Sequence, residues 1–64
     1  MSATERDLRI AREAGERAAR LGKPVSACPP YDNTARGCAQ AEAWQMGYDD
    51  ERARLSRLQR KVVA

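Results

Sequence analysis

The chain carries Cys28-Pro29-Pro30-Tyr31 near its middle and Trp44-Gln45-Met46-Gly47-Tyr48 further on. These two stretches hold every aromatic ring of a 64-residue protein that is otherwise rich in alanine, arginine and glutamate. Large apolar side chains are scarce elsewhere, and buried rings contribute heavily to a small core. We therefore expect the three rings to meet, and the fold to be organised around them.

The segment before the proline-rich stretch has the pattern of one helix. Thr4 is followed three residues later by the carboxylate of Asp7, which is a helix-start signal. Gly22 followed by Lys23-Pro24 is a typical helix end, because glycine accepts the left-handed conformation and proline cannot continue the helix. We predict a helix over residues 4–21.

Small residues form a stripe along one face of this predicted helix. Ala11, Gly15, Ala18 and Gly22 follow one another at steps of four, three and four. A glycine inside a helix costs about 1 kcal/mol relative to alanine. Close approach of a second helix or of a ring is the expected compensation at Gly15.

The rest of the chain predicts an ordered loop over residues 22–33 and a second helix over residues 34–61. The loop holds all three prolines, and the second helix carries apolar residues at heptad-like steps that end in Leu55, Leu58 and Val62. Its last part is rich in arginine. Residues 1–64 are thus predicted to be a single small all-α domain: two helices joined by a Pro-rich ordered loop, a helix–loop–helix hairpin, with a basic amphipathic C-terminal extension.

The composition offers no pattern of an enzyme. Histidine is absent, so the usual base beside a nucleophile is missing, and the four glycines form no phosphate-binding loop. The run Asp49-Asp50-Glu51 fits an internal counter-charge better than a magnesium site. We expect no catalytic activity, no cofactor, no metal site and no small-molecule substrate.

The sequence also shows no apolar run long enough for a membrane span and no secretion signal, so we expect a cytoplasmic protein without membrane contact. In that compartment Cys28 and Cys38 are expected to be free thiols. A disulfide between them remains open for an oxidising setting.

The positive charge of the chain has two interpretations, a binding surface and a solvated face. The formal net charge is +3, and arginine far outnumbers lysine among the twelve cations. Guanidinium groups pair with phosphate in a bidentate way and stack on bases, which suits nucleic acid or an acidic protein surface. On charge alone, a solvated face balanced by acidic residues is the slightly favoured interpretation.

The rings have two interpretations. Trp44 and Tyr48 are four residues apart and share one helix face, where they could build a small core or offer a platform for stacking bases. We favour the core for Trp44. Tyr31 stays open, because its loop position leaves its hydroxyl edge available.

The order of these small and aromatic residues matches the pattern Gly-x-x-Ala-x-x-x-Gly, Cys-Pro-Tyr, Trp-x-x-Gly-aromatic, and so resembles the ribosome modulation factor family. The match covers about two thirds of the chain, roughly residues 11–51, with Pro30 inserted before Tyr31. The residues that would define the fold by this resemblance are Gly15, Ala18, Gly22, Cys28, Pro29, Trp44, Gly47 and Tyr48.

The resemblance implies a protein that binds the small ribosomal subunit through ribosomal RNA and promotes translational inactivity, the state called ribosome hibernation. Contact with RNA would fall to cations beside the motif and to the loop tyrosine: Arg17, Arg20, Lys23, Tyr31 and Arg36.

The alternative is a phage- or plasmid-borne regulator that binds a host protein, or a second copy of itself, through its C-terminal helix. The residues that would carry that role are Arg54, Leu55, Arg57, Leu58 and Arg60. Salt separates the two hypotheses, because RNA binding weakens steeply with ionic strength and apolar docking does not.

Overall fold

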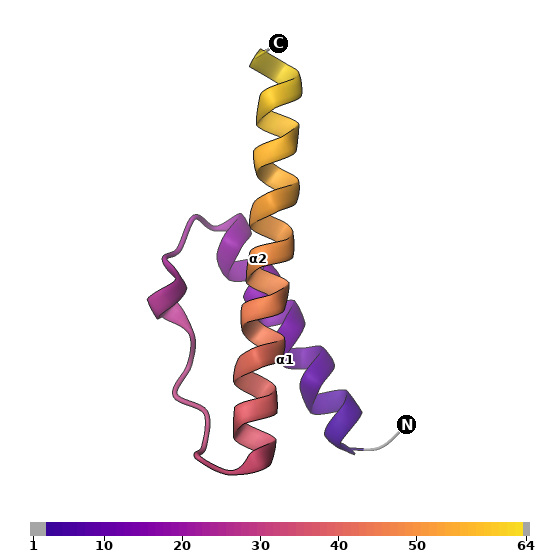
Figure 1. The fold of residues 1–64 in the computed structure, drawn as a ribbon, viewed down its shortest axis with the longest axis vertical. Coiled ribbons are helices and arrows are strands. Elements are labelled where there is room, and N and C mark those ends of the chain that lie inside the picture. Colours follow the sequence, from indigo (N-terminus) through magenta and orange to yellow (C-terminus); the bar gives the residue numbers. More distant parts are fainter. Residues whose placement is uncertain (1–2, 64) are drawn as a thin grey trace.

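The protein is all-α, with two long helices and one short 3-10 helix between them (Figure 1). The computed structural model describes the backbone of residues 3–63 and the side chains of residues 4–58. Helix α1 spans Ala3–Arg20, η1 spans Val25–Ala27 and α2 spans Ala35–Val63. The predicted helix–loop–helix architecture is confirmed, with helix ends within two residues of the predicted ones.

The two helices run in the same general direction, and the loop returns alongside them (Figure 1). Two ion pairs show this direction. Asp7 near the start of α1 pairs with Arg36 near the start of α2, and Arg20 at the end of α1 pairs with Glu51 further along α2. The helices are therefore not antiparallel neighbours as in a tight hairpin. The reason is the loop: it is long enough to run back along the pair before α2 begins.

Two glycines let the helices cross in close contact. A side-chain carbon added to Gly15 would overlap the carbonyl oxygen of Trp44, and one added to Gly47 would overlap the carbonyl oxygen of Arg12. In both cases the obstacle is backbone of the opposite helix, which cannot move aside. The close approach expected at Gly15 is thus present, and Gly47 supplies its counterpart on α2.

The core is small and lies at this crossing. Trp44 and Tyr48 are the buried rings, 2% and 3% exposed, and they stack with their centroids 5.2 Å apart. Alanines of α1 cover them, and Cys28 and Tyr31 of the loop pack against the edge of the cluster. The core interpretation of Trp44 is confirmed.

Hydrogen bonds hold the loop at the end where it leaves α1. Gly22 has φ +71°, and the amides of Gly22 and Lys23 donate to the carbonyls of Ala19 and Ala18, which is the Schellman arrangement of a helix end. The hydroxyl of Tyr48 donates to the carbonyl of Lys23 at 2.5 Å and ties the turn to α2. Gly22 therefore ends α1, and, unlike Gly15 of the predicted stripe, it makes no close contact with α2.

Helix α2 begins with a side-chain cap. The hydroxyl of Thr34 accepts from the amide of Gly37 at 3.1 Å, so it satisfies a donor that the first turn leaves without an intrahelical partner. Gly37 is buried, and a side chain on it would overlap the backbone of Asp32. The spacing of small residues in the sequence does not predict this close contact at Gly37.

Helix α2 extends well past α1, so its last part stands apart from the rest of the molecule (Figure 1). Beyond Glu51, no side chain in the described part of α2 is buried. We call residues 52–63 the C-terminal arm. None of the described helices is both long and apolar enough to cross a membrane.

Candidate nucleic-acid interface

Several of the arginines serve the fold, because they neutralise acidic residues across the two helices. Arg20 Nε lies 2.8 Å from Glu51 Oε2, and Arg54 of the following helical turn binds the other carboxylate oxygen. Arg12 Nη2 lies 2.7 Å from Asp50 Oδ2. Asp50 and Glu51 of the acidic run therefore act as an internal counter-charge, as the sequence suggested.

Glu51 is the centre of this ion-pair cluster. Its carboxylate is only 7% exposed, and its pKa is held below the ordinary value of a glutamate. The largest cause is the hydrogen bond from Arg54, and the nearby positive charges of Arg54 and Arg20 act in the same direction. Arg20, predicted to contact RNA, is thus partly engaged within the fold.

Arg36 lies at the other end of the molecule. It sits in the first turn of α2 and pairs with Asp7 of α1. At 1.5 Å per residue, Arg36 and Glu51 are about 22 Å apart along α2. The structure therefore does not bring Arg36 together with the other predicted RNA-binding cations.

Arg17 and Lys23 do lie together, at the end of α1. Both are exposed and line one open pocket between α1 and the loop. Leu21 and Pro29 form apolar walls of that pocket, and no acidic residue lines it. In the part of the chain described here, neither cation has an ion-pair partner.

Leu21, the last residue of the predicted helix, is 63% exposed. It follows the last helical residue, Arg20, and so belongs to the turn at Gly22 rather than to the buried stripe.

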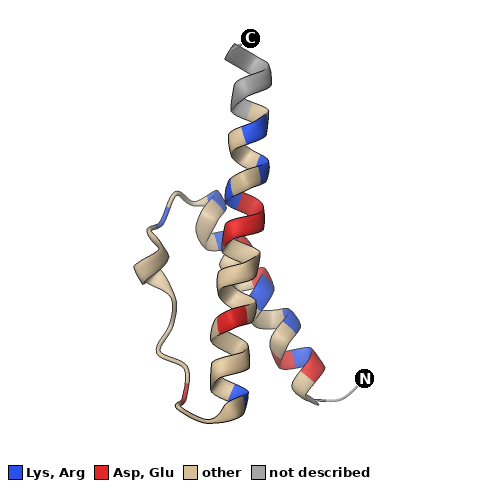
Figure 2. Ribbon diagram, in the orientation of Figure 1, with Lys and Arg blue, Asp and Glu red and all other residues tan. Residues whose placement is uncertain are grey.

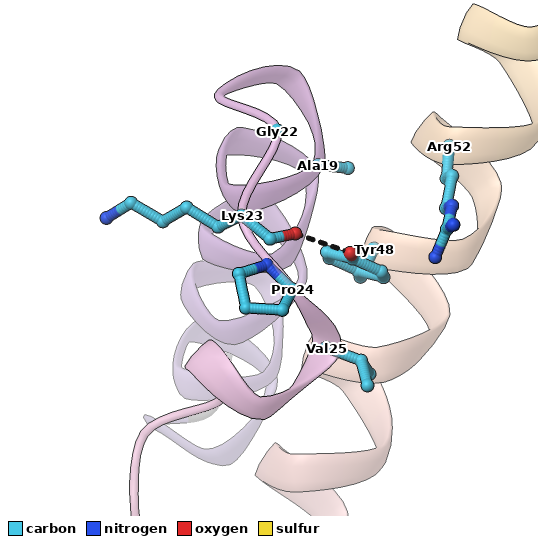
Figure 3. A pocket seen from close by; sticks show the side chains of 7 residues that line it. All are labelled: Ala19, Gly22, Lys23, Pro24, Val25, Tyr48 and Arg52. Atoms are coloured by element: carbon cyan, nitrogen blue, oxygen red, sulfur yellow. Dashed lines mark hydrogen bonds between the residues drawn. The ribbon is translucent and has the colours of Figure 1, made fainter.

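A second pocket lies on the other side of the Gly22 turn, and Figure 3 shows its lining. Arg52 stands beside the ring of Tyr48, whereas the side chain of Lys23 extends away from it (Figure 3). Arg52 was not among the predicted site residues. Its position four residues after Tyr48, on the same helix face, was the available signal.

Two loop residues of the motif, Cys28 and Tyr31, pack against the core, and both have raised pKa values. Tyr31 is half-buried against the core, and burial, together with the nearby Cys28, raises the pKa of its hydroxyl. Burial also raises the pKa of the Cys28 thiol, which keeps it protonated and weakly nucleophilic. Cys28 and Cys38 are both free thiols. The described residues contain no cluster of three or more potential metal ligands.

The predicted partner-binding residues lie on the C-terminal arm. Arg57 is exposed, Leu58 is 46% exposed, and Leu55 is half-buried. Arg54 is turned toward Glu51. The side chain of Arg60, the last member of that predicted set, lies outside the described residues.

Charge is distributed unevenly along the chain. Residues 1–51 contain seven cationic and nine acidic side chains, which gives a formal charge of −2. Residues 52–64 contain five cationic side chains and no acidic one, which gives +5. In Figure 2 the charged residues that follow the acidic run of α2 within the described part are all basic. The basic character of the protein therefore belongs to one end.

Comparison of the chain with protein-family models, with curated proteins and with solved structures finds no match at the thresholds applied.

Proposed function

We propose that the protein binds RNA, specifically ribosomal RNA of the small subunit, and promotes translational inactivity by occupying its binding site. The resemblance to the ribosome modulation factor family suggests the target. The observation that supports binding is the pair Arg17 and Lys23: two exposed cations without ion-pair partners among the described residues, in a pocket that no acidic residue lines.

Other features favour the same end of the molecule. Arg52 lies on the far side of the Gly22 turn from that pocket, and the C-terminal arm continues the positive charge. Phosphate contacts of this kind supply most of the affinity for nucleic acid and fix the position of the protein on it. Arg20 and Arg36 are engaged in ion pairs with Glu51 and Asp7, so their first role in the proposal is to hold the two helices together.

In this proposal the buried rings do not contact RNA themselves, and Tyr48 acts by positioning the turn at Lys23. Trp44 and Tyr48 are buried, which leaves their faces closed to bases. The hydroxyl of Tyr48 holds the carbonyl of Lys23, so the ring positions the turn from which the lysine side chain projects. RNA is then recognised through its phosphates and its shape.

Sedimentation with ribosomes at increasing salt tests the proposal. The purified chain is expected to co-sediment at low salt and to lose affinity steeply as salt rises. Replacing Arg17 and Lys23 by alanine should weaken binding and reduce the slope of log K against log salt by about 1.4–1.8, because each lost phosphate contact contributes about 0.7–0.9.

The matched control replaces Arg6 and Arg9 by alanine, since these two exposed cations lie on the same helix as Arg17 and their loss changes the net charge equally. This variant should keep most of the salt slope. Failure of the unmodified chain to sediment with ribosomes or to shift ribosomal RNA at low salt would refute the proposed function. Equal loss in both variants would refute the assignment to Arg17 and Lys23.

A further inference from the structure

The C-terminal arm carries a row of apolar side chains that the proposed RNA binding does not require. Leu55 and Leu58 continue the spacing of Tyr48 and Glu51, with steps of three, four and three residues. Tyr48 and Glu51 are buried at the contact with α1, whereas Leu58 is 46% exposed. The row that packs on α1 therefore runs on past the end of α1, where Figure 1 shows no other element beside it.

This spacing is that of a coiled coil, and it defines which positions flank the row. With Tyr48 and Leu55 at position a, and Glu51 and Leu58 at position d, Arg52 falls at position e and Arg54 at position g. Side chains at e and g face the neighbouring helix and set which partner is accepted. On this arm both are cationic.

The charge decides between a second copy of this chain and a different partner. Two copies of the arm, parallel or antiparallel, would place cations beside cations, because residues 52–64 contain no acidic side chain. Like charges across such an interface oppose association. A helix with glutamates at the flanking positions would instead meet an opposite charge at each of them.

We propose that the C-terminal arm is a docking surface for an acidic amphipathic helix of a partner protein. The partner helix continues the packing of this row beyond the end of α1, with leucine-sized residues against Leu55 and Leu58 and a glutamate against Arg52, while Arg54 stays paired with Glu51. The ion pair between Arg54 and Glu51 holds the Arg54 side chain at the start of this surface. This surface shares Arg52 with the cationic end proposed to bind RNA, whereas its apolar row, Leu55 and Leu58, does not line the pocket at Arg17 and Lys23.

A pair of synthetic peptides tests the proposal on the full chain. One helical peptide carries leucine at positions a and d and glutamate at e and g, and the other carries lysine in place of every glutamate. In a fluorescence anisotropy titration the glutamate peptide is expected to bind and the lysine peptide is not. Leu58→Ala should weaken binding about tenfold, which is the loss expected for one buried leucine.

Met46 provides the matched control, because it is an exposed apolar residue of α2 outside the arm, 56% exposed. Met46→Ala should leave peptide binding unchanged, and circular dichroism should show both variants folded. Equal binding of the two peptides, or equal effects of Leu58→Ala and Met46→Ala, would overturn the proposal.

Other occupants give distinct results that also overturn it. Self-association of the unmodified chain in sedimentation equilibrium, lost in Leu58→Ala, would assign the row to a second copy. Displacement of the peptide by single-stranded RNA, with no effect of Leu58→Ala on either ligand, would make the arm a purely electrostatic surface. Replacing Arg17 and Lys23 should not change peptide binding, and Leu58→Ala should not change ribosome sedimentation. Failure of either proposal can therefore be told from failure of the other.

Discussion

At the scale of single residues, the glycines have different physical roles. Gly15 and Gly47 are required for space, since any side chain there would overlap backbone of the opposite helix. Gly22 is required for conformation, since its φ of +71° lies in the left-handed region and nothing is within 4 Å of a carbon added to it. Substitution by alanine should separate these two roles.

Gly15→Ala is expected to destabilise the protein strongly. An added methyl group must push the backbone at Trp44 away, and overpacking of this kind typically costs about 1–3 kcal/mol. In a domain of this size each kcal/mol lowers the melting temperature by about 4–8 °C. Thermal unfolding followed by circular dichroism measures the effect.

The sign of the change makes this test decisive. At an exposed helical site, Gly→Ala stabilises by about 0.5–1 kcal/mol. A rise in melting temperature for Gly15→Ala would therefore contradict the close crossing. Gly22→Ala is the comparison: left-handed strain of about 1–2 kcal/mol should destabilise the turn without disturbing the contact between helices.

At the scale of elements, ion pairs fasten α1 to α2 beyond the glycine contact. The buried carboxylate of Glu51 joins Arg20 of α1 to Arg54 of its own helix. The Arg12–Asp50 and Asp7–Arg36 pairs add further links along the helices. Among these carboxylates, Glu51 has a lowered pKa, so the pairing of α1 with α2 should depend on pH through Glu51.

Low pH should lower the free energy of unfolding through protonation of Glu51. Its pKa is lower in the folded chain than in the unfolded chain, so its contribution to stability is complete above the ordinary glutamate pKa and is lost as pH falls through the folded value. Glu51→Gln is expected to lower the free energy of unfolding at neutral pH and to flatten its decline below about pH 5.

Chemical denaturation at a series of pH values measures this dependence. Glu42→Gln is the control, because Glu42 is an exposed carboxylate of the same helix. It should leave the pH profile close to that of the unmodified chain. Identical profiles for Glu51→Gln and Glu42→Gln would show that the Glu51 cluster does not fasten the helices.

At the scale of the whole molecule, folding and charge are divided between two regions. The crossing of α1 and α2 contains the core, whereas the excess positive charge comes entirely from residues 52–64. Such a division allows the arm to bind a partner without disturbing the core. It also predicts that the arm can be removed without unfolding the rest.

A chain that ends at Arg54 should keep the melting temperature of the full protein within a few degrees. It retains the Glu51 ion pairs and every buried residue of the core, while its formal net charge falls from +3 to zero. Thermal unfolding tests its stability, and the two binding assays test its function. A fall in melting temperature as large as that of Gly15→Ala would contradict the division.

The amino-acid sequence by itself determined the helices, the loop and the identity of the core rings. Local signals suffice for these features: the terminating Gly22 before Pro24, the spacing of small residues along α1, and the i, i+4 pair of Trp44 and Tyr48. Each depends on neighbours a few residues away, which a periodic pattern records directly.

Only the tertiary structure decided the direction of the helices and which cations remain available. Arg17, Arg20, Lys23 and Arg36 look alike in sequence, yet Arg20 and Arg36 are engaged by Glu51 and Asp7, and Arg36 lies at the far end. The reason is physical, because pairing of charges depends on distance in space. Arg20 and Glu51 are 31 positions apart in the sequence, and Asp7 and Arg36 are 29 positions apart. Each pair meets only because the loop brings α2 back beside α1. The same packing buries Tyr48 and leaves Leu58 exposed, although one repeat places both in a single row.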